Sequence, residues 1–452
     1  MRNFFIGCEW VHALSNEPAE IRATAAQITF EVGGVNLTRA EDLWSKTVVP
    51  SVLVSAYPLA LWLASSWWRL LYEPVPPLVR GALSDADWRM SHEVAAAGHG
   101  FVWPTIALAG DGSVVQFWAS ADAATDTEVK SVVYIDKLSA PFSVPREEFV
   151  DVVSSFINTT VARLRQEGVE ETPLDHLWGF IRDDAGQSEV VEVRRIEAAL
   201  GFDAEECPDD LLADALDFSR KLGYANFLEL APAFRVSGRL SGIEGIKCFL
   251  EMDSLRAKLN IPKIDYEKVG VAGVLPWEKG VKIAKLLRSQ VLPKKPLKVS
   301  NVELCKLLGL DGDQPGYHGA IKGLQASVGI PAGDGEFKLI IRKKPGDGRR
   351  FEYARLIGDS IFGRTDFGSS GGLTSTDLGT SRQKMQRAFA AEFLCPIDRL
   401  VDSLSGDFSE TAIENAANRF GVSEKTVEYQ LMNNHVIPSA AGCIDFPYRL
   451  AS

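Results

Sequence analysis

Residues 350–359 read Arg-Phe-Glu-Tyr-Ala-Arg-Leu-Ile-Gly-Asp, and this stretch decides the fold of the C-terminal part of the chain. We expect it to form a helix. Arg355 and Asp359 are four residues apart, so a helix places both side chains on one face, where they can form an ion pair. We hypothesise that this pair holds the helix against its neighbours. The alternative is that both residues are solvated surface charges.

A second helix is expected over residues 383–396, which read Gln-Lys-Met-Gln-Arg-Ala-Phe-Ala-Ala-Glu-Phe-Leu-Cys-Pro. The two stretches together resemble the ImmA/IrrE family of metallopeptidases, whose corresponding helices read roughly R-F-T-L-A-H-E-L-G-H and E-x-E-A-N-x-F-A-A-E-L-L-M-P. The matching positions are Arg350, Phe351, Ala354 and Gly358 in the first helix, and Phe389, Ala390, Ala391, Glu392, Leu394 and Pro396 in the second.

The positions that carry the family's zinc chemistry do not match. A His-Glu-x-x-His helix presents two imidazoles to one zinc ion, and its glutamate is the general base for the metal-bound water. Here Arg355 replaces the first His, Leu356 the Glu and Asp359 the second His, while Gln383 and Met385 replace acidic positions of the second helix. Arginine stays protonated and leucine accepts no proton. The resemblance therefore implies a degenerate peptidase site, with no metal, no other cofactor and no catalytic residue.

Other segments extend the resemblance over roughly residues 270–440. Pro276–Gly280 opens an amphipathic helix that continues over 281–291, and a short helix is expected over 302–310. A strand over 337–341 leads into the helix that contains Arg355. Residues 412–436 resemble the helix-turn-helix that closes the family's domain, with Gly421-Val422-Ser423 at the turn.

Length and composition predict a multidomain α+β protein. The chain has 452 residues, of which 46% are hydrophobic and 24% are charged, as in ordinary globular proteins. We expect a mixed α/β domain over 1–168, a helical region over 169–265, a mostly helical zincin-like domain over 266–440 and a tail over 441–452. The six cysteines form no CxxC pair and the N-terminus shows no secretory pattern, which favours the cytoplasm.

The N-terminal region shows strand and helix signals but no recognisable function. Hairpins are expected over 25–39 and 101–120, a further strand over 132–135, and helices over 145–167, 194–200 and 209–222. The uncharged stretch 48–68 is broken by prolines. We therefore expect a buried helix over 58–71 that carries Trp62, Trp67 and Trp68, and no membrane span. His92 and His99 are weak metal candidates, and a capped, partly buried His pair is the preferred interpretation.

Charge is distributed unevenly along the chain. The formal net charge is −16 over residues 1–250, +8 over 251–350 and −4 over 351–452. The basic segment could bind nucleic acid, or it could dock on the acidic half of the chain, which the acidic overall charge favours. The possible contacts with nucleic acid or a partner are Lys294, Lys295, Lys298, Lys343, Lys344 and Lys425.

The helix-turn-helix expected over residues 412–436 has few features of a DNA-binding motif. Ser423 is a plausible N-cap for its second helix, whose exposed early residues include Glu424, Lys425 and Glu428. Two carboxylates beside one ammonium group match phosphate poorly. We expect this unit to pack against the rest of the domain, and DNA contact is the alternative.

Two classes of function follow. The first is a non-catalytic regulatory or interaction protein that binds a protein or peptide partner in a bacterial regulatory, stress or phage-defence setting, as relatives in this family do. In that case the former peptidase cleft persists as a binding groove. The second is a metallo-endopeptidase with unrecognised ligands, against which the presence of only six histidines argues. A DNA-binding transcriptional regulator is a further alternative.

Overall fold

The described residues form two compact units, unit 1 within residues 1–208 and unit 2 within residues 209–442. The computed structural model describes residues 3–12, 16–75, 86–122, 131–232, 255–264, 274–292, 296–310, 326–343, 346–362 and 372–438. The boundary after Pro208 differs from the expected boundaries at 168 and 265. The reason is that two helices within residues 173–200 pack on helices of the first unit. The expected tail 441–452 lies outside the described residues.

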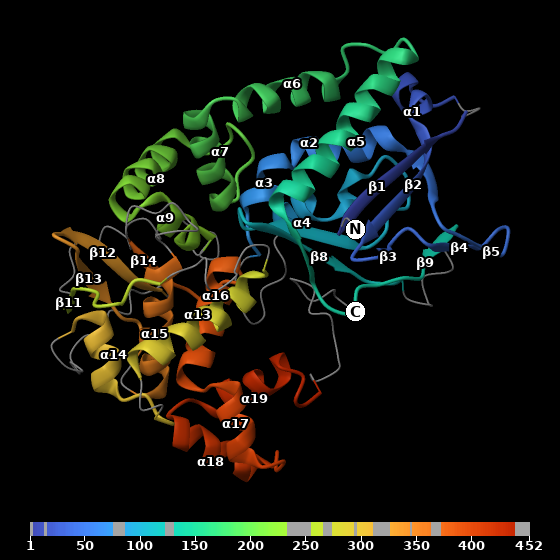
Figure 1. Cartoon of the computed structure of the whole chain (residues 1–452). Helices are drawn as coiled ribbons and strands as arrows, with labels where there is room; N and C mark the ends of the chain where they lie inside the picture. The colour runs from blue at the N-terminus through green and yellow to red at the C-terminus, as the bar shows by residue number, and fades with distance from the viewer. Residues whose placement is uncertain are drawn as a thin grey trace. The chain divides into compact units, whose positions relative to one another are not determined.

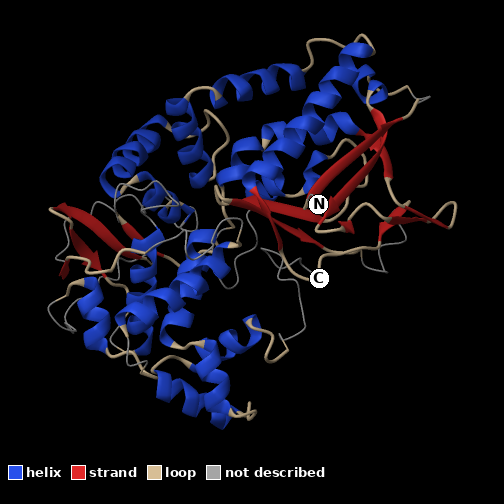
Figure 2. Ribbon diagram, in the orientation of Figure 1, coloured by secondary structure: helices blue, strands red, loops and turns tan. Residues whose placement is uncertain are grey.

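The fold class is mixed α+β, with sixteen α-helices and several small antiparallel sheets among the described residues (Figure 2). In unit 1, β1 (Phe4–Trp10), β2 (Ala25–Val32), β3 (Val35–Asn36) and β6 (Val52–Ser55) form one sheet. A second sheet contains β7 (Ile106–Gly110), β8 (Val114–Ala119) and β10 (Phe142–Pro145). A third contains β4 (Ala40–Asp42), β5 (Thr47–Val49) and β9 (Val132–Tyr134). The expected hairpins and the strand at 132–135 are confirmed, whereas β1, β4, β5, β6 and β10 were not predicted.

Helices precede, connect and follow these strands in unit 1 (Figure 1). The helices are α1 (Ala19–Ala23), α2 (Ala56–Ser65), α3 (Trp67–Tyr72), α4 (Ala86–His92), the 3-10 helix η1 (Val94–Ala97), α5 (Arg146–Gln166), α6 (Pro173–Ala185) and α7 (Ser188–Leu200). The helix expected over 58–71 is two helices, because the chain leaves helical geometry at Ser66. Its three tryptophans are buried, as predicted.

The core of unit 1 is apolar and rich in aromatic rings. Along β2 the buried side chains alternate with half-buried ones, so one face of the first sheet packs inward. Phe4, Phe30, Phe117 and Phe149 meet there, with ring centroids 5.0–6.3 Å apart. Phe149 comes from α5, whose apolar stripe covers this face of the sheet. Burial of these rings contributes to the stability of unit 1.

Unit 2 is built around one small sheet and a group of packed helices. The sheet order is β11 (Leu255–Ala257), β13 (Glu336–Ile340), β12 (Ser327–Gly333) and β14 (Leu373–Ser375), so β14 is an edge strand. The helices are α8 (Asp209–Leu222), α9 (Tyr224–Leu230), α13 (Pro276–Val291), α14 (Asn301–Leu308), α15 (Asp347–Phe362), α16 (Ser381–Leu394), α17 (Ile397–Leu404), α18 (Glu410–Phe420) and α19 (Glu424–Asn433). The helices and the strand expected from the sequence are present. The elements α9, α17, β11, β12 and β14 were not predicted, and β11 lies within the region 169–265 that was expected to be helical.

The helices α13, α15 and α16 lie side by side because glycines let their backbones approach closely (Figure 1). A Cβ atom on Gly280 of α13 would lie 2.4 Å from the backbone oxygen of Met385 in α16. A Cβ atom on Gly358 of α15 would lie 2.8 Å from the ring of Phe389. Thr380 caps α16 by accepting a hydrogen bond from the Gln383 amide. No described helix in either unit is both long and apolar enough to cross a membrane.

Candidate functional site

A cluster of buried polar side chains lies where α15, α16, β14 and α9 meet in unit 2. We call it the polar cluster, and its members are Asn226, Glu229, Glu352, Arg355, Asp359, Thr374, Thr376, Thr380, Arg382, Gln383 and Gln386. Each of these residues is at most 7% exposed. A buried charge is costly unless it is paired and hydrogen-bonded, so the partners of each group decide what the cluster can do.

Asp359 is the centre of the polar cluster. Its carboxylate accepts hydrogen bonds from Arg382 Nε at 2.7 Å and Nη2 at 2.8 Å, which is a two-point ion pair. It also accepts from Gln386 Nε2 at 2.6 Å and from the backbone N–H of Thr374 at 2.8 Å. Burial alone would lower the pKa of Arg382, but the charge and hydrogen bonds of Asp359, together with the charge of Glu229, outweigh it and the pKa is raised. The lone pairs of Asp359 are therefore committed to donors.

Arg355 has a different set of partners. Its Nη2 donates to the backbone oxygen of Thr376 at 2.6 Å and to Gln383 Oε1, and its Nη1 lies 3.6 Å from Glu352 Oε2. Burial lowers the pKa of this guanidinium, although Glu352 opposes that change. The predicted Arg355–Asp359 ion pair is wrong, because each residue pairs with another group. The alternative of two solvated surface charges is also wrong, because both side chains are buried.

Glu352 connects the polar cluster to the sheet. Its Oε1 accepts hydrogen bonds from Ser327 Oγ at 2.6 Å and from Arg342 Nε at 3.1 Å. Arg342 in turn binds both oxygens of Asp377, at 2.8 and 2.7 Å. Burial would raise the pKa of Asp377, but the hydrogen bonds from Arg342 outweigh it and lower the pKa. Positive and negative groups thus alternate through this part of the cluster.

Helix α9 covers the other side of the cluster. Asn226 Oδ1 accepts from Arg382 Nη2 at 2.7 Å and from Thr374 Oγ1 at 2.9 Å, and Arg382 Nη1 donates to the backbone oxygen of Ala225 at 3.0 Å. A Cβ atom on Gly372 would lie 2.2 Å from the Asn226 side chain, so glycine permits this approach.

A second contact fixes the C-terminal end of α9. Thr380 Oγ1 lies 2.9 Å from both carboxylate oxygens of Glu229. The same hydroxyl accepts from the Gln383 amide as the cap of α16. One threonine therefore joins the start of α16 to α9.

The edge strand β14 is also closed by the cluster. The backbone N–H of Thr374 donates to Asp359, and its backbone oxygen accepts from Gln386 Nε2 at 2.9 Å and from Gln383 Nε2 at 3.3 Å. An extended peptide that pairs with an edge strand needs these same backbone groups. Among the described residues, the expected groove is therefore occupied at Thr374 by side chains of α15 and α16.

Three of the five predicted site residues come together, and two do not. Arg355, Asp359 and Gln383 belong to the polar cluster. Leu356 and Met385 point into the hydrophobic core of unit 2 instead. Sequence reasoning missed Arg382 and Gln386, although their four-residue spacing on α16 could have placed them on one face. Nothing in the sequence marked Asn226 and Glu229, because α9 is distant from the other members.

The basic residues proposed as contacts lie in several parts of unit 2. Lys298 is exposed, and its side chain lies where a Cβ atom on Gly421 would be. Lys343 is exposed next to the start of α15, and Lys425 is exposed with its ammonium 5.7 Å from the Tyr429 ring. The remaining three, Lys294, Lys295 and Lys344, lie outside the described residues.

The helix-turn-helix consists of α18 and α19, and it packs on the rest of unit 2 as expected. Gln430 of α19 donates through Nε2 to Glu392 Oε2 at 3.1 Å and to the backbone oxygen of Cys395 at 3.0 Å. Glu392 also accepts from the Ile397 amide at the start of α17, at 3.3 Å. Burial raises the pKa of Glu392. This carboxyl group therefore links α16, α17 and α19.

The predicted pair of partly buried histidines in unit 1 is wrong. His92 is fully buried, and its ring stacks on Trp88 with centroids 4.2 Å apart. Its Nδ1 lies 2.6 Å from the backbone oxygen of Leu108, and its Nε2 lies 3.0 Å from Glu73 Oε2. His99 is exposed. His92 is thus a core residue with both ring nitrogens in contact with protein groups.

Within the described ranges, no group of three or more His, Cys, Asp and Glu side chains could hold a metal ion. No protein-family model matches the chain, and no match was found among curated proteins or solved structures. The functional argument therefore depends on the residues and their contacts.

Proposed function

We propose that unit 2 is a zinc-free pseudopeptidase domain of ImmA/IrrE type, and that the protein is a non-catalytic regulatory or interaction protein of the bacterial cytoplasm. The observation that supports this most strongly is the polar cluster itself. At the positions where the resemblance expects zinc ligands, Arg355 and Asp359 are buried and each is bound to other protein groups. The setting, whether gene regulation, stress or phage defence, is inferred from the resemblance.

The residues of the cluster do not fit a zinc ion. A zinc site needs neutral imidazoles, thiolates or carboxylates with a free lone pair. Arg355 offers a permanent cation, and the carboxylate of Asp359 already accepts four hydrogen bonds. Leu356, at the position of the general base, lies in the apolar core. Ion pairs and hydrogen bonds would then perform the structural role of the metal.

The partner surface is proposed to lie in unit 1 and not at the former cleft, because α9 and the β14 contacts close the cleft. Unit 1 exposes four large apolar side chains on its strands and turns, Phe5, Trp44, Val48 and Leu53. Trp44 is 91% exposed, and Asp42 Oδ1 fixes its turn by accepting from the amides of Trp44 and Ser45. A preorganised exposed tryptophan is typical of a protein-binding hot spot.

Metal analysis of untagged protein purified without chelator tests the proposal. We expect less than about a tenth of a zinc ion per chain, against about one for a structural or catalytic site. Thermal unfolding provides an independent measurement, and neither added zinc nor a chelator should shift the midpoint. About one zinc per chain, together with a lower midpoint after chelation, would overturn the pseudopeptidase proposal.

A further inference from the structure

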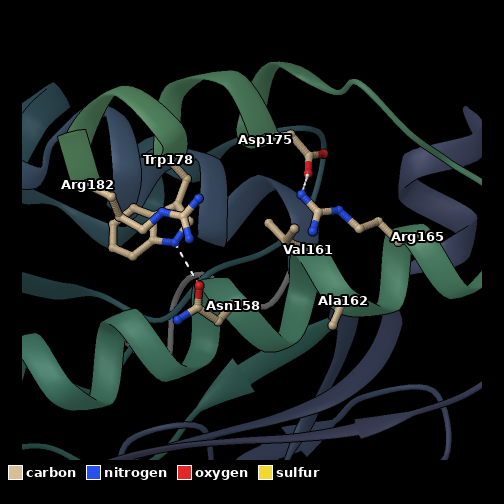
Figure 3. Close-up of a pocket in the computed structure, with 7 residues that line it drawn as sticks. All are labelled: Asn158, Val161, Ala162, Arg165, Asp175, Trp178 and Arg182. Atoms are coloured by element: carbon tan, nitrogen blue, oxygen red, sulfur yellow. Dashed lines mark hydrogen bonds and ion pairs between the residues drawn. The ribbon is translucent and has the colours of Figure 1, made fainter.

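A shallow groove lies between α5 and α6 of unit 1. It encloses about 100 Å³ and opens to solvent. The lining residues are Asn158, Val161, Ala162, Arg165, Asp175, Trp178 and Arg182 (Figure 3). Figure 3 shows the side chains of Arg165 and Arg182 extending from the two helices into the space between them.

The hydrogen-bond acceptors of this groove are already in use. Asn158 Oδ1 accepts from Trp178 Nε1 at 2.8 Å. The carboxylate of Asp175 accepts from Arg165 Nη2 at 2.9 Å and from Thr172 Oγ1 at 2.7 Å, as part of the capping box that starts α6. A ligand that needs acceptors would therefore compete with bonds that stabilise the helix pair.

Several donors, in contrast, are available. The Arg182 guanidinium and the Asn158 amide nitrogen make no hydrogen bond with any described residue. Arg165 uses only its Nη2, in the ion pair with Asp175. Two guanidinium groups and one carboxylate give the groove a formal charge of +1. An arginine fork matches the oxygens of a carboxylate or phosphate group in particular.

The floor of the groove is rigid and partly apolar. Trp178 is buried, and its ring meets the edge of Trp67 at 5.1 Å with an interplanar angle of 75°. Its indole N–H is fixed by Asn158. Val161 and Ala162 complete the floor. A ligand would therefore meet a preformed surface, which reduces the entropic cost of binding.

We infer that the α5–α6 groove binds a small anion, namely a carboxylate or phosphate group, between Arg165 and Arg182. The small volume of the groove suits a single such group. The inference does not depend on the resemblance of unit 2 to any family.

The indole N–H signal of Trp178 in a ¹H–¹⁵N NMR spectrum provides the measurement, with the signal assigned by Trp178→Phe. Inorganic phosphate and acetate are titrated separately at constant ionic strength, so the two sources of the anion are distinguished. We expect a saturable shift with one or both probes and a Kd of about 1 mM or weaker, as few heavy atoms are bound. Tetramethylammonium chloride is the cationic control and should cause no saturable shift.

Substitutions show whether the shift of the Trp178 signal comes from anion binding in the α5–α6 groove. Arg182→Gln should weaken binding about tenfold, because one charge-assisted hydrogen-bond donor is lost. Arg22→Gln removes another exposed arginine of unit 1 and serves as the matched control, with no expected change. Absence of a saturable shift with both probes would overturn the inference, as would equal affinity in wild type and Arg182→Gln. Because the Arg182 side chain makes no hydrogen bond or ion pair within the described part of the chain, its loss should leave the fold intact.

Discussion

Two buried arginines, one in each unit, have very different surroundings. In unit 1, Arg69 pairs with the buried Glu73 at 2.6 Å but also reaches Asp87 at 3.2 Å and Asp203 at 3.6 Å. Those two aspartates are 60% and 40% exposed, so the network extends to solvent. In unit 2, Arg382 contacts Asp359, Asn226 and Ala225, and the two side chains among these are fully buried.

The two arginines should respond differently when one of their carboxylate partners is removed. In an open network, which reaches solvent, water can take the place of a lost carboxylate. In a closed network, which is fully buried, the loss leaves the arginine charged and without solvation. Unit 1 has an aromatic core with open networks of this kind, of which Arg194 with Asp184, Glu197 and Glu205 is another. Unit 2 places ion pairs between its central helices, an expensive arrangement if stability were its only purpose.

The largest effect is expected for Asp359→Asn, which keeps the shape of the side chain but removes its charge. Arg382 would remain buried without a counter-ion, at a cost of about 3–5 kcal/mol in the free energy of unfolding. Hydrogen exchange of the α15 and α16 amides in the full chain measures the loss in unit 2 alone. A cost below about 1 kcal/mol would mean that water enters the cluster and that it is not closed.

A smaller loss is expected for Gly280→Ala. The new methyl group would lie 2.4 Å from the backbone oxygen of Met385, so α13 and α16 would have to separate. Overpacking of this kind costs about 1–3 kcal/mol. Gly348→Ala in α15 is the control, because no heavy atom lies within 4 Å of its Cβ position. It should stabilise the helix by roughly 0.5–1 kcal/mol. Equal effects of the two substitutions in urea unfolding would contradict the close-packed arrangement.

Glu392→Gln should change the pH dependence of stability. The folded-state pKa of Glu392 is raised by burial, so the folded protein binds more protons than the unfolded chain between the two pKa values. Wild-type stability must therefore fall as pH rises through this window. The Ile397 amide and Lys285, 3.8 Å from the carboxylate, favour the charged form and so reduce the effect on the free energy of unfolding. Urea unfolding is measured at about pH 5 and about pH 8. The free energy of unfolding of the variant, relative to that of the wild type, should be higher at about pH 8 than at about pH 5. A constant difference would show that Glu392 titrates normally.

The smallest effect is expected for Asp203→Asn, which is the matched substitution in the open network. Arg69 retains Glu73, and water can replace the exposed carboxylate, so the cost should be at most about 1 kcal/mol. Thermal unfolding followed by tryptophan fluorescence measures it, since nine of the ten tryptophans precede residue 209. A loss as large as that of Asp359→Asn would remove the distinction between the two networks.

Local signals in the sequence predicted many elements but not the contacts of the site. Helices such as α5 and α13 begin with proline next to a glutamate-containing first turn, and their limits differ little from the prediction. The break at Ser66 was missed because every residue from Pro58 to Leu71 suits a buried helix. The short strands β12 and β14 were missed because they contain few of the alternating residues that mark a strand.

The contacts of the polar cluster could not be predicted from local sequence patterns. Helical spacing correctly placed Arg355 and Asp359 on α15, but both residues have buried partners from distant segments. Thr374 and Asn226, which bond each other inside the cluster, are 148 positions apart in the chain. Spacing within one helix cannot predict a partner that only tertiary folding brings near. The sequence could therefore not show that Arg355 and Asp359 bind separate sets of partners instead of each other.

The closed edge of β14 has a consequence for the solubility of unit 2. An unpaired strand edge is a template on which another chain can add, and such additions start aggregation. Here side chains of Asp359, Gln383 and Gln386 occupy the outward backbone groups of Thr374. These side chains therefore also protect the strand from intermolecular pairing, and loss of the cluster should produce aggregates before it produces soluble unfolded chains.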